Sequence, residues 1–205
     1  MSGVRLIAGL GNPGPRYADT RHNVGARLVR NLADRFRIPL VNESRFKGEL
    51  GRGDLLGHDI RLLIPATYMN LSGESVGAVA RFYRIESHEI LIAYDEMAFE
   101  PGVVRLRQGG GANGHNGITS VIAGLGNDRN FHRLRIGVGH PGSREMVTAF
   151  LTSIRMPESE RALVDAACTL PDAVLAELLD GNFAKAMNQL HAPAEKPSPD
   201  QKEKP

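Results

Sequence analysis

Side chains of the kinds that move protons occur in four separate stretches of this 205-residue chain. Each stretch follows or adjoins an apolar run, as the loops of a sheet do. Because such loops meet at one edge of an α/β sheet, we expect their polar groups to share a site. The candidates are Asn12 with His22, then Asn70, then Asp95, and finally His115 with Asn116.

His22 and Asp95 have the chemistry of a general base and its partner. A histidine that donates one ring N–H to a carboxylate is held in one tautomer and is stabilised when it takes up a proton. Such a pair can deprotonate water, an effect of about 10²–10⁴-fold in rate. Asparagine amides can orient that water and donate to a developing oxyanion. Simpler roles stay open, since Asp95 also suits a turn and Asn70 a helix cap.

Signatures of other hydrolytic mechanisms are missing from the sequence. There is no G-x-S-x-G elbow, and none of the seven histidines has metal-ligand spacing to another. The single cysteine, Cys168, lies in an apolar helical pattern with no cation beside it. It is therefore predicted to be a buried structural thiol in a reducing compartment. We expect neither a metal nor a cofactor.

The string "GLGNPG" has the G-x-G-x-x-G spacing of a dinucleotide-binding loop at Gly9, Gly11 and Gly14. In that motif a helix begins within the glycines, but here Pro13 and Pro15 oppose helical geometry and lack amide donors. No acid ends a second strand at the required distance, and no G-K-[ST] follows. The pattern instead predicts a rigid loop that presents Asn12, Tyr17 and His22.

Charge is distributed unevenly, although the formal net charge is only +2. Residues 103–144 contain six arginines and one acid, Asp128, whereas residues 145–190 contain seven acids and three bases. Arginine suits phosphate because its planar fork donates two parallel hydrogen bonds. A phosphate-bearing partner is therefore plausible, with a solvated basic face as the alternative.

Hydrophobic periodicity alternates between strands and helices, which predicts one α/β domain with a mixed sheet flanked by helices, like that of phosphorylases and hydrolases. The domain is expected over residues 1–190, followed by a disordered, proline-rich tail over 191–205. No apolar run of membrane-spanning length occurs, so we expect a cytoplasmic protein without membrane contact. Strands are expected near 4–10, within 46–66, and near 90–96, 103–108 and 134–139. Helices are expected near 23–36, 69–85, 118–125, 144–153 and 158–190, the last with a break or bend around Pro171.

Five strings are similar to those of bacterial peptidyl-tRNA hydrolases and occur in the order of that family. They span residues 3–190: "GLGNPGPRYADTRHNVG", "PATYMNLSGESV", "ILIAYDE", "GGGANGHNG" and "NFHRLRIGVGHP". The resemblance implies an enzyme that cleaves the ester between an N-blocked peptide and the 3′-terminal ribose of tRNA. It also implies tRNA recycling during translation, a monomer, and no stable protein partner.

The same resemblance implies a role for each matching residue. His22 would be the proton acceptor, Asp95 the acid that stabilises it, and Asn12 the residue that separates N-blocked from free aminoacyl esters. The other implied positions bind peptidyl-tRNA, at its 3′ end and acceptor stem. They are Tyr17, Tyr68, Met69, Asn70, His115 and Asn116, with the arginines Arg105, Arg107, Arg135 and Arg144.

Two positions depart from the family pattern. Asn113 stands where the family usually has glycine, but asparagine tolerates left-handed backbone angles, so the loop is expected to persist. Ala98 replaces a common acid, which leaves the pinning of the loop after Asp95 unexplained. Two rival functions remain at this point: an RNA-binding module without catalysis, and an amide hydrolase of the aminopeptidase kind.

Overall fold

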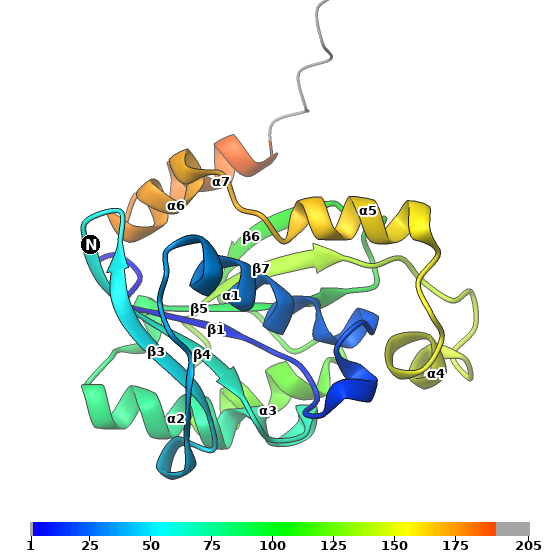
Figure 1. Ribbon diagram of the computed structural model, residues 1–205, viewed down its shortest axis with the longest axis horizontal. Coiled ribbons are helices and arrows are strands. Elements are labelled where there is room, and N and C mark those ends of the chain that lie inside the picture. Colours follow the sequence, from blue (N-terminus) through cyan, green and yellow to red (C-terminus); the bar gives the residue numbers. More distant parts are fainter. Residues whose placement is uncertain (1, 192–205) are drawn as a thin grey trace, which may run out of the picture.

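A mixed seven-stranded sheet in the order β2-β3-β4-β1-β5-β7-β6 forms the centre of the molecule (Figure 1). The structure is a computed structural model and describes residues 2–191. The tail predicted over 191–205 starts at the last residue of the final helix and otherwise lies outside the described residues. The strands are β1 Leu6–Gly9, β2 Val41–Glu43, β3 Gly48–Leu55, β4 His58–Pro65, β5 Ile90–Glu96, β6 Val104–Gln108 and β7 His132–Gly137.

The four central strands, β4, β1, β5 and β7, run parallel, and the outer strands run antiparallel to their neighbours. In the middle of the sheet Ile7 lies between Leu62 and Leu91. Parallel central strands are covered on both faces, which is why they read as continuous apolar runs. The mixed sheet predicted from the sequence is thus confirmed.

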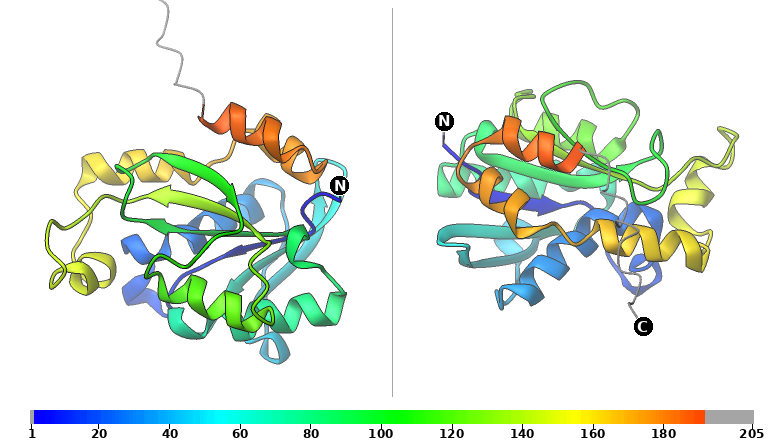
Figure 2. Two further views of the ribbon diagram at one scale, coloured as in Figure 1. Left: turned by 180° about the vertical axis from the view of Figure 1, so that it is seen from behind. Right: turned by 90° about the horizontal axis from the view of Figure 1, so that it is seen from above.

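Helices cover both faces of the sheet (Figures 1 and 2). The first helix and the four last helices share one hydrophobic cluster with the sheet, and the second and third helices share the other. The helices are α1 Val24–Arg35, α2 Ser72–Tyr83, α3 Asn116–Gly124, α4 Val147–Thr152, α5 Glu158–Ala167, α6 Asp172–Leu179 and α7 Phe183–His191.

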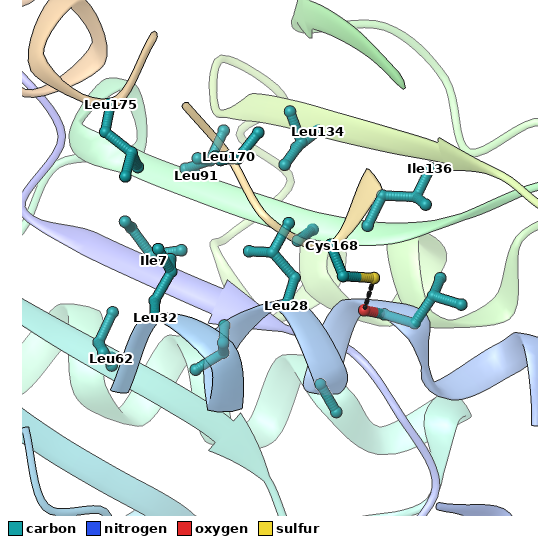
Figure 3. Close-up of a cluster of buried hydrophobic side chains, with 14 of the residues drawn as sticks. Ile7, Leu28, Leu32, Leu62, Leu91, Leu134, Ile136, Cys168, Leu170 and Leu175 are labelled. Carbon is teal, nitrogen blue, oxygen red and sulfur yellow. Dashed lines mark hydrogen bonds between the residues drawn. The ribbon is translucent and has the colours of Figure 1, made fainter. Parts of the chain in front are cut away.

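Cys168 belongs to the cluster on the α1 face, where leucine and isoleucine side chains from the central strands, α1 and α6 meet (Figure 3). Its thiol is fully buried and donates a weak hydrogen bond to the Val24 carbonyl. Burial raises the pKa of the thiol to about 12. The prediction of a structural rather than nucleophilic cysteine is therefore confirmed.

Two elements differ from the sequence-based expectation. The break or bend predicted at Pro171 is confirmed, since α5 ends and α6 begins on either side of residues 168–171, but a second break at Gly181, where φ is 81° just after α6, was not predicted. Strand β2 was not predicted, because its three residues are mostly exposed and carry no apolar pattern. Among the described residues, no helix is long and apolar enough to cross a membrane.

Candidate functional site

A cleft of about 450 Å³ opens at the edge of the sheet where β1, β4 and β5 end. The predicted convergence of the polar loops is correct, since all six candidates from the four stretches line this cleft. Its walls are Asn12, His22, Tyr68, Met69, Asn70, Tyr94, Asp95, Glu96, Met97, Ala112, Asn113, Gly114, His115, Asn116, Val147, Thr148, Leu151 and Thr152.

The glycines that resemble a nucleotide loop bring α1 close to the sheet. A Cβ on Gly9 would lie 2.1 Å from the Gly25 carbonyl oxygen, and one on Gly25 would lie 2.1 Å from the Ala93 oxygen. Any side chain at either position would push the start of α1 away from β1 and β5. The short helix η2 (Arg21–Asn23) precedes α1, so this close approach sets His22 beside Asp95.

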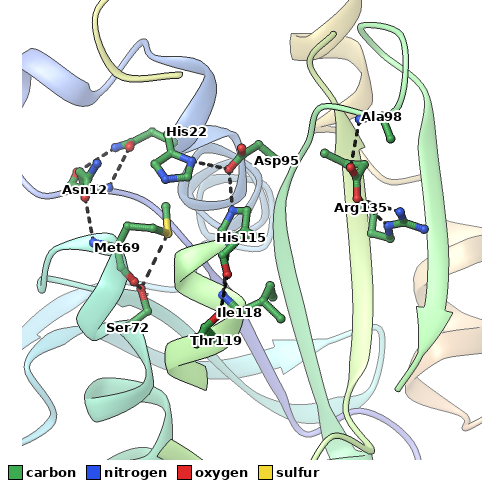
Figure 4. A network of polar contacts seen from close by, with 12 residues as sticks. Asn12, His22, Met69, Ser72, Asp95, Ala98, His115, Ile118, Thr119 and Arg135 are labelled. Atoms are coloured by element: carbon green, nitrogen blue, oxygen red, sulfur yellow. Dashed lines mark hydrogen bonds and ion pairs between the residues drawn. The ribbon is translucent and has the colours of Figure 1, made fainter. Parts of the chain in front are cut away.

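Asp95 joins two histidines from different parts of the chain (Figure 4). Its Oδ1 lies 2.8 Å from Nδ1 of His22 and 3.0 Å from Nε2 of His115. The carboxylate is buried and both rings are largely buried. The predicted His22–Asp95 pair therefore exists, and His115 binds the same carboxylate oxygen, with its ring centre 5.1 Å from that of His22.

The hydrogen bonds assign a tautomer to each ring. Nδ1 of His115 accepts the backbone N–H of Ile118 at 3.2 Å as the cap of α3, so its proton is on Nε2, which donates to Asp95. His22 likewise donates Nδ1–H to the carboxylate, which leaves the lone pair of Nε2 free. Only His22 therefore keeps a basic nitrogen for chemistry.

The pKa of the Asp95 carboxyl is held well below its usual value. Burial by itself raises the pKa, but the charge and hydrogen bonds of His115 and His22 lower it by more. Asp95 thus remains a carboxylate throughout the neutral and mildly acidic range. A permanent negative charge at this position stabilises the imidazolium that forms when His22 takes up a proton.

The same three side chains are the set of described residues that could hold a metal ion. One ligand-type atom of each lies within 4.8 Å of the others. These atoms already make the two hydrogen bonds to Asp95, so a metal would have to replace both of them. The arrangement also suits a hydrogen-bonded base, which needs no ion.

Asn12 is fixed so that its amide NH₂ group is left for the cleft. Its side-chain oxygen accepts the backbone N–H of Met69 at 2.8 Å. Its backbone N–H and carbonyl bond both ends of the Asn23 side-chain amide. The sequence did not reveal this role of Asn23, because it depends on contact with the Asn12 backbone 11 residues away.

The remaining predicted contacts lie around the mouth of the cleft. Asn70 is exposed within η4 (Met69–Leu71), and Asn116 is exposed at the first turn of α3. Leu71, not Asn70, stands at the start of α2, so the cap interpretation of Asn70 is wrong. Tyr68 is 55% exposed at the rim. Tyr17 does not line the cleft and instead stacks with Arg16.

The loop that carries His115 begins at the far edge of the sheet. Strand β6 is antiparallel to β7, so Gln108 lies next to the first residue of β7, and the segment 109–115 must return across the sheet. Arg133 holds it by donating to the carbonyls of Gly110 and Gly111. The sequence analysis counted Arg133 as surface charge, but it is 2% exposed. Its place in a buried apolar strand was the available signal.

The two departures from the family pattern have structural explanations. Asn113 adopts a φ of 48°, so the expected left-handed conformation is confirmed. The backbone N–H of Ala98 donates to Oε1 of Glu96 at 3.0 Å, and this bond pins the loop after Asp95 without the missing acid. Oε2 of the same glutamate binds Arg135 at 2.7 Å.

The basic block divides into different environments. Arg105 and Arg107 on β6 lie opposite Arg135 and Arg133 on β7, so all four share one face. Arg107 and Arg144 are exposed and Arg105 is half-buried, whereas Arg135 is neutralised by Glu96 and covers Phe99. Arg133 is structural. The sequence-derived charge of this block therefore exceeds what its surface presents.

A further wall of the cleft comes from α4, which no motif predicted. Val147, Thr148, Leu151 and Thr152 face the cavity from this six-residue helix. The sequence gives its i, i+4 spacing but no chemical signature, so only the fold reveals its position.

Comparison with known proteins assigns this architecture. Residues 6–199 match the model of the peptidyl-tRNA hydrolase family. The chain is 51% identical to the peptidyl-tRNA hydrolase of Pectobacterium carotovorum over 192 residues, covering 94% of this chain and 98% of that protein. It is 50% identical to that of Shewanella frigidimarina over 194 residues, with coverages of 94% and 98%. The crystal structure of the enzyme from Acinetobacter baumannii superposes with a TM-score of 0.89 at 48% identity, covering 94% of this chain and 96% of that one.

Proposed function

Since the chain belongs to the peptidyl-tRNA hydrolase family and hydrolyses peptidyl-tRNA, we propose that His22 is the base that activates the attacking water. The observation that carries this proposal is the 2.8 Å contact between Nδ1 of His22 and buried Asp95. It leaves Nε2 as an unshared acceptor at the cleft wall. An acyl ester is reactive enough to be cleaved by a positioned water without a covalent intermediate.

In the proposed reaction Nε2 of His22 removes a proton from water while the oxygen attacks the ester carbonyl carbon. The tetrahedral intermediate carries its negative charge on the former carbonyl oxygen, within reach of the amide donors of Asn70 and Asn116 at the mouth. Collapse breaks the bond to the 3′-oxygen of the ribose, which receives the proton from the imidazolium. The products are a peptide carboxylic acid, which ionises in solution, and tRNA with a free 3′-hydroxyl.

Asn12 is proposed to select N-blocked substrates. Its oxygen is occupied by the Met69 N–H, so its NH₂ group meets the substrate as a donor. A peptidyl ester offers an amide carbonyl that accepts such a hydrogen bond. A free aminoacyl ester offers a cationic amine instead, which a donor repels. Because the contact is to backbone, it is indifferent to the peptide's side chains.

The acceptor stem is proposed to lie along the β6–β7 face beside the cleft. Arg105, Arg107 and Arg144 supply charge for phosphates, and Arg135 adds a guanidinium oriented by Glu96. Exposed Tyr68, with Met69 beneath it, gives a terminal base a surface on which to stack. Tyr17 lies outside the cleft and would contact tRNA only at its edge.

The family assignment sets aside the two rivals, a binding module without catalysis and an amide hydrolase of the aminopeptidase kind. We further propose that the protein works as a monomer in the cytoplasm, since all four loops of the cleft come from one chain. The substrate itself is found where translation takes place.

The test is hydrolysis in water enriched in ¹⁸O, with N-acetyl-aminoacyl-tRNA and the matching free aminoacyl-tRNA as substrates. Direct attack by water puts the label in the acyl product and none in the tRNA, and only the blocked ester is cleaved rapidly. Trapping of an acylated enzyme would overturn direct attack. Equal rates on both esters in the wild type would remove the role of Asn12.

A further inference from the structure

Arg21, the residue before His22, carries a buried charge that the proposed reaction does not use. Its side chain is 2% exposed, and isolated burial of a guanidinium is strongly unfavourable. Its partners must therefore compensate for the loss of water. They all lie on one segment of the chain, residues 150–160.

The guanidinium holds that segment by four contacts. It donates to the carbonyls of Phe150 and Ile154 at 3.4 and 3.1 Å, near the C-terminal end of α4. It also donates to Glu160 at 2.8 Å, in the first turn of α5. Its plane lies 4.0 Å from the centre of the Phe150 ring. A cation at this end of α4 also complements the helix dipole.

Helix α4 depends on such an attachment. A helix of six residues is unstable alone, because nucleation costs more than so few hydrogen bonds return. It lies at the end of the molecule away from α6 and α7, beyond a loop in which Gly139 and Gly142 have positive φ angles (Figure 1). Among the described elements, α4 makes its most extensive contact with η2, which carries Arg21 and His22.

The attached helix forms part of the cleft. Leu151 is buried, and Val147 and Thr148 line the same cleft as His22 and His115. Arg21 and His22 are neighbours in η2, so the position of α4 and the position of the base depend on the same backbone. A displacement of α4 would open the cleft to water on the side opposite Asn70.

We propose that Arg21 is a positioning residue that fixes α4 as the wall of the substrate cleft. The proposal rests on the proposed role of His22 but assigns Arg21 no contact with the reacting atoms. Lysine cannot replace it, because a single ammonium cannot reach two carbonyls and a carboxylate in a plane while stacking on an aromatic ring.

The experiment compares wild type with Arg21→Lys on N-acetyl-aminoacyl-tRNA and follows amide hydrogen exchange. We expect KM to rise about 5- to 20-fold, because hydrogen bonds of a charged group are lost, while kcat stays within about threefold of the wild-type value. Exchange should accelerate in 147–154 and stay unchanged in β5. The acid limb of the rate profile should not move, because the His22–Asp95 contact remains.

Arg161→Lys is the matched control. Arg161 joins α5 to Asp19 at 3.2 Å without touching α4, so its replacement should leave both KM and exchange at 147–154 unchanged. Should Arg21→Lys fold poorly, Glu160→Gln removes the charged partner alone and is expected to shift both readouts in the same direction by less.

Three results would overturn the proposal: unchanged exchange at 147–154, accelerated exchange with a wild-type KM, or a loss confined to kcat with a displaced acid limb. The last would mean that Arg21 acts on His22 itself. Failure of His22 as the base would appear separately, as wild-type turnover in His22→Ala with Arg21 intact.

Discussion

The cleft and the β6–β7 face use charged side chains in opposite ways. In the cleft, Asp95 is buried and both partner rings are fixed by hydrogen bonds of 2.8 and 3.0 Å. On the β6–β7 face Arg107 is exposed, as is Arg144 in the loop between β7 and α4, and neither has a carboxylate partner among the described residues. One region is organised before substrate arrives, and the other is free to adjust to it.

The difference fits the roles proposed for the two regions. A reacting water has to be held within a few tenths of an ångström of the base. The His22 ring is therefore buried and held in one tautomer by its hydrogen bond to Asp95. Phosphates repeat along an RNA backbone, and salt screens their charges. Solvent-exposed arginine side chains are therefore sufficient to bind them. Arg133 and Arg135 mark the boundary, since they lie on the basic face but serve the cleft's loops.

The largest effect is expected from His22→Ala, which removes the only free basic nitrogen of the network. Turnover of N-acetyl-aminoacyl-tRNA should fall about 10²–10⁴-fold, while tRNA affinity and thermal stability stay near wild type. Single-turnover rates and equilibrium binding measure these separately. As a control, His58→Ala removes an exposed histidine paired with Asp180 and should change neither. Wild-type turnover without His22 would end the assignment of the base.

Asp95→Asn tests the fixed charge and should cost about 10²–10³-fold in rate. The pKa of Asp95 is lowered, so its carboxylate contributes stability above about pH 4, and this contribution is lost as pH falls through the lowered value. Without the charge, the imidazolium that forms during the proposed reaction loses its stabilising partner, so the loss should fall on kcat. Single-turnover rates measure it, and a variant with wild-type kcat would show that Asp95 does not stabilise the base.

On the β6–β7 face, the double variant Arg105→Ala/Arg107→Ala should raise KM by about tenfold and leave kcat almost unchanged. The dependence of log affinity on log salt should become less steep by about 0.9 for each lost duplex-phosphate contact. Arg52→Ala is the control, since Arg52 on β3 pairs with Asp59 on β4, toward the other edge of the sheet. An unchanged salt slope would exclude β6 from the tRNA surface.

The smallest effect is expected at the loop that borders both regions. Asn113 has a φ of 48°, so Asn113→Gly should alter stability by less than about 1 kcal/mol and activity by less than about twofold. Asn113→Val should instead destabilise the loop, because a β-branched residue is strained there. Urea unfolding and steady-state kinetics compare the pair. Equal stability of the two variants would mean that the loop conformation is not fixed.

Much of the site could be predicted from the sequence, because residue type and position after apolar runs are local properties. Asn12, His22, Asn70, Asp95 and Asn116 were predicted in this way, and all five line one cleft. The predictions stopped where a role depends on distant partners. The arginines of residues 103–144 could not be divided into exposed and structural ones from the sequence. That division requires knowing that Arg133 binds the glycine loop and that Glu96 neutralises Arg135.

The sequence by itself determined the α/β class, the mixed sheet and the chemistry available at its edge, since periodicity and side-chain type need no neighbours. Tertiary structure alone decided that His115 shares Asp95 with His22 and that α4 closes the cleft. It also showed that Gly9 of "GLGNPG" is a point of close contact between β1 and α1. These features depend on distances between segments as far apart in the sequence as η2 and α4, and only packing fixes such distances.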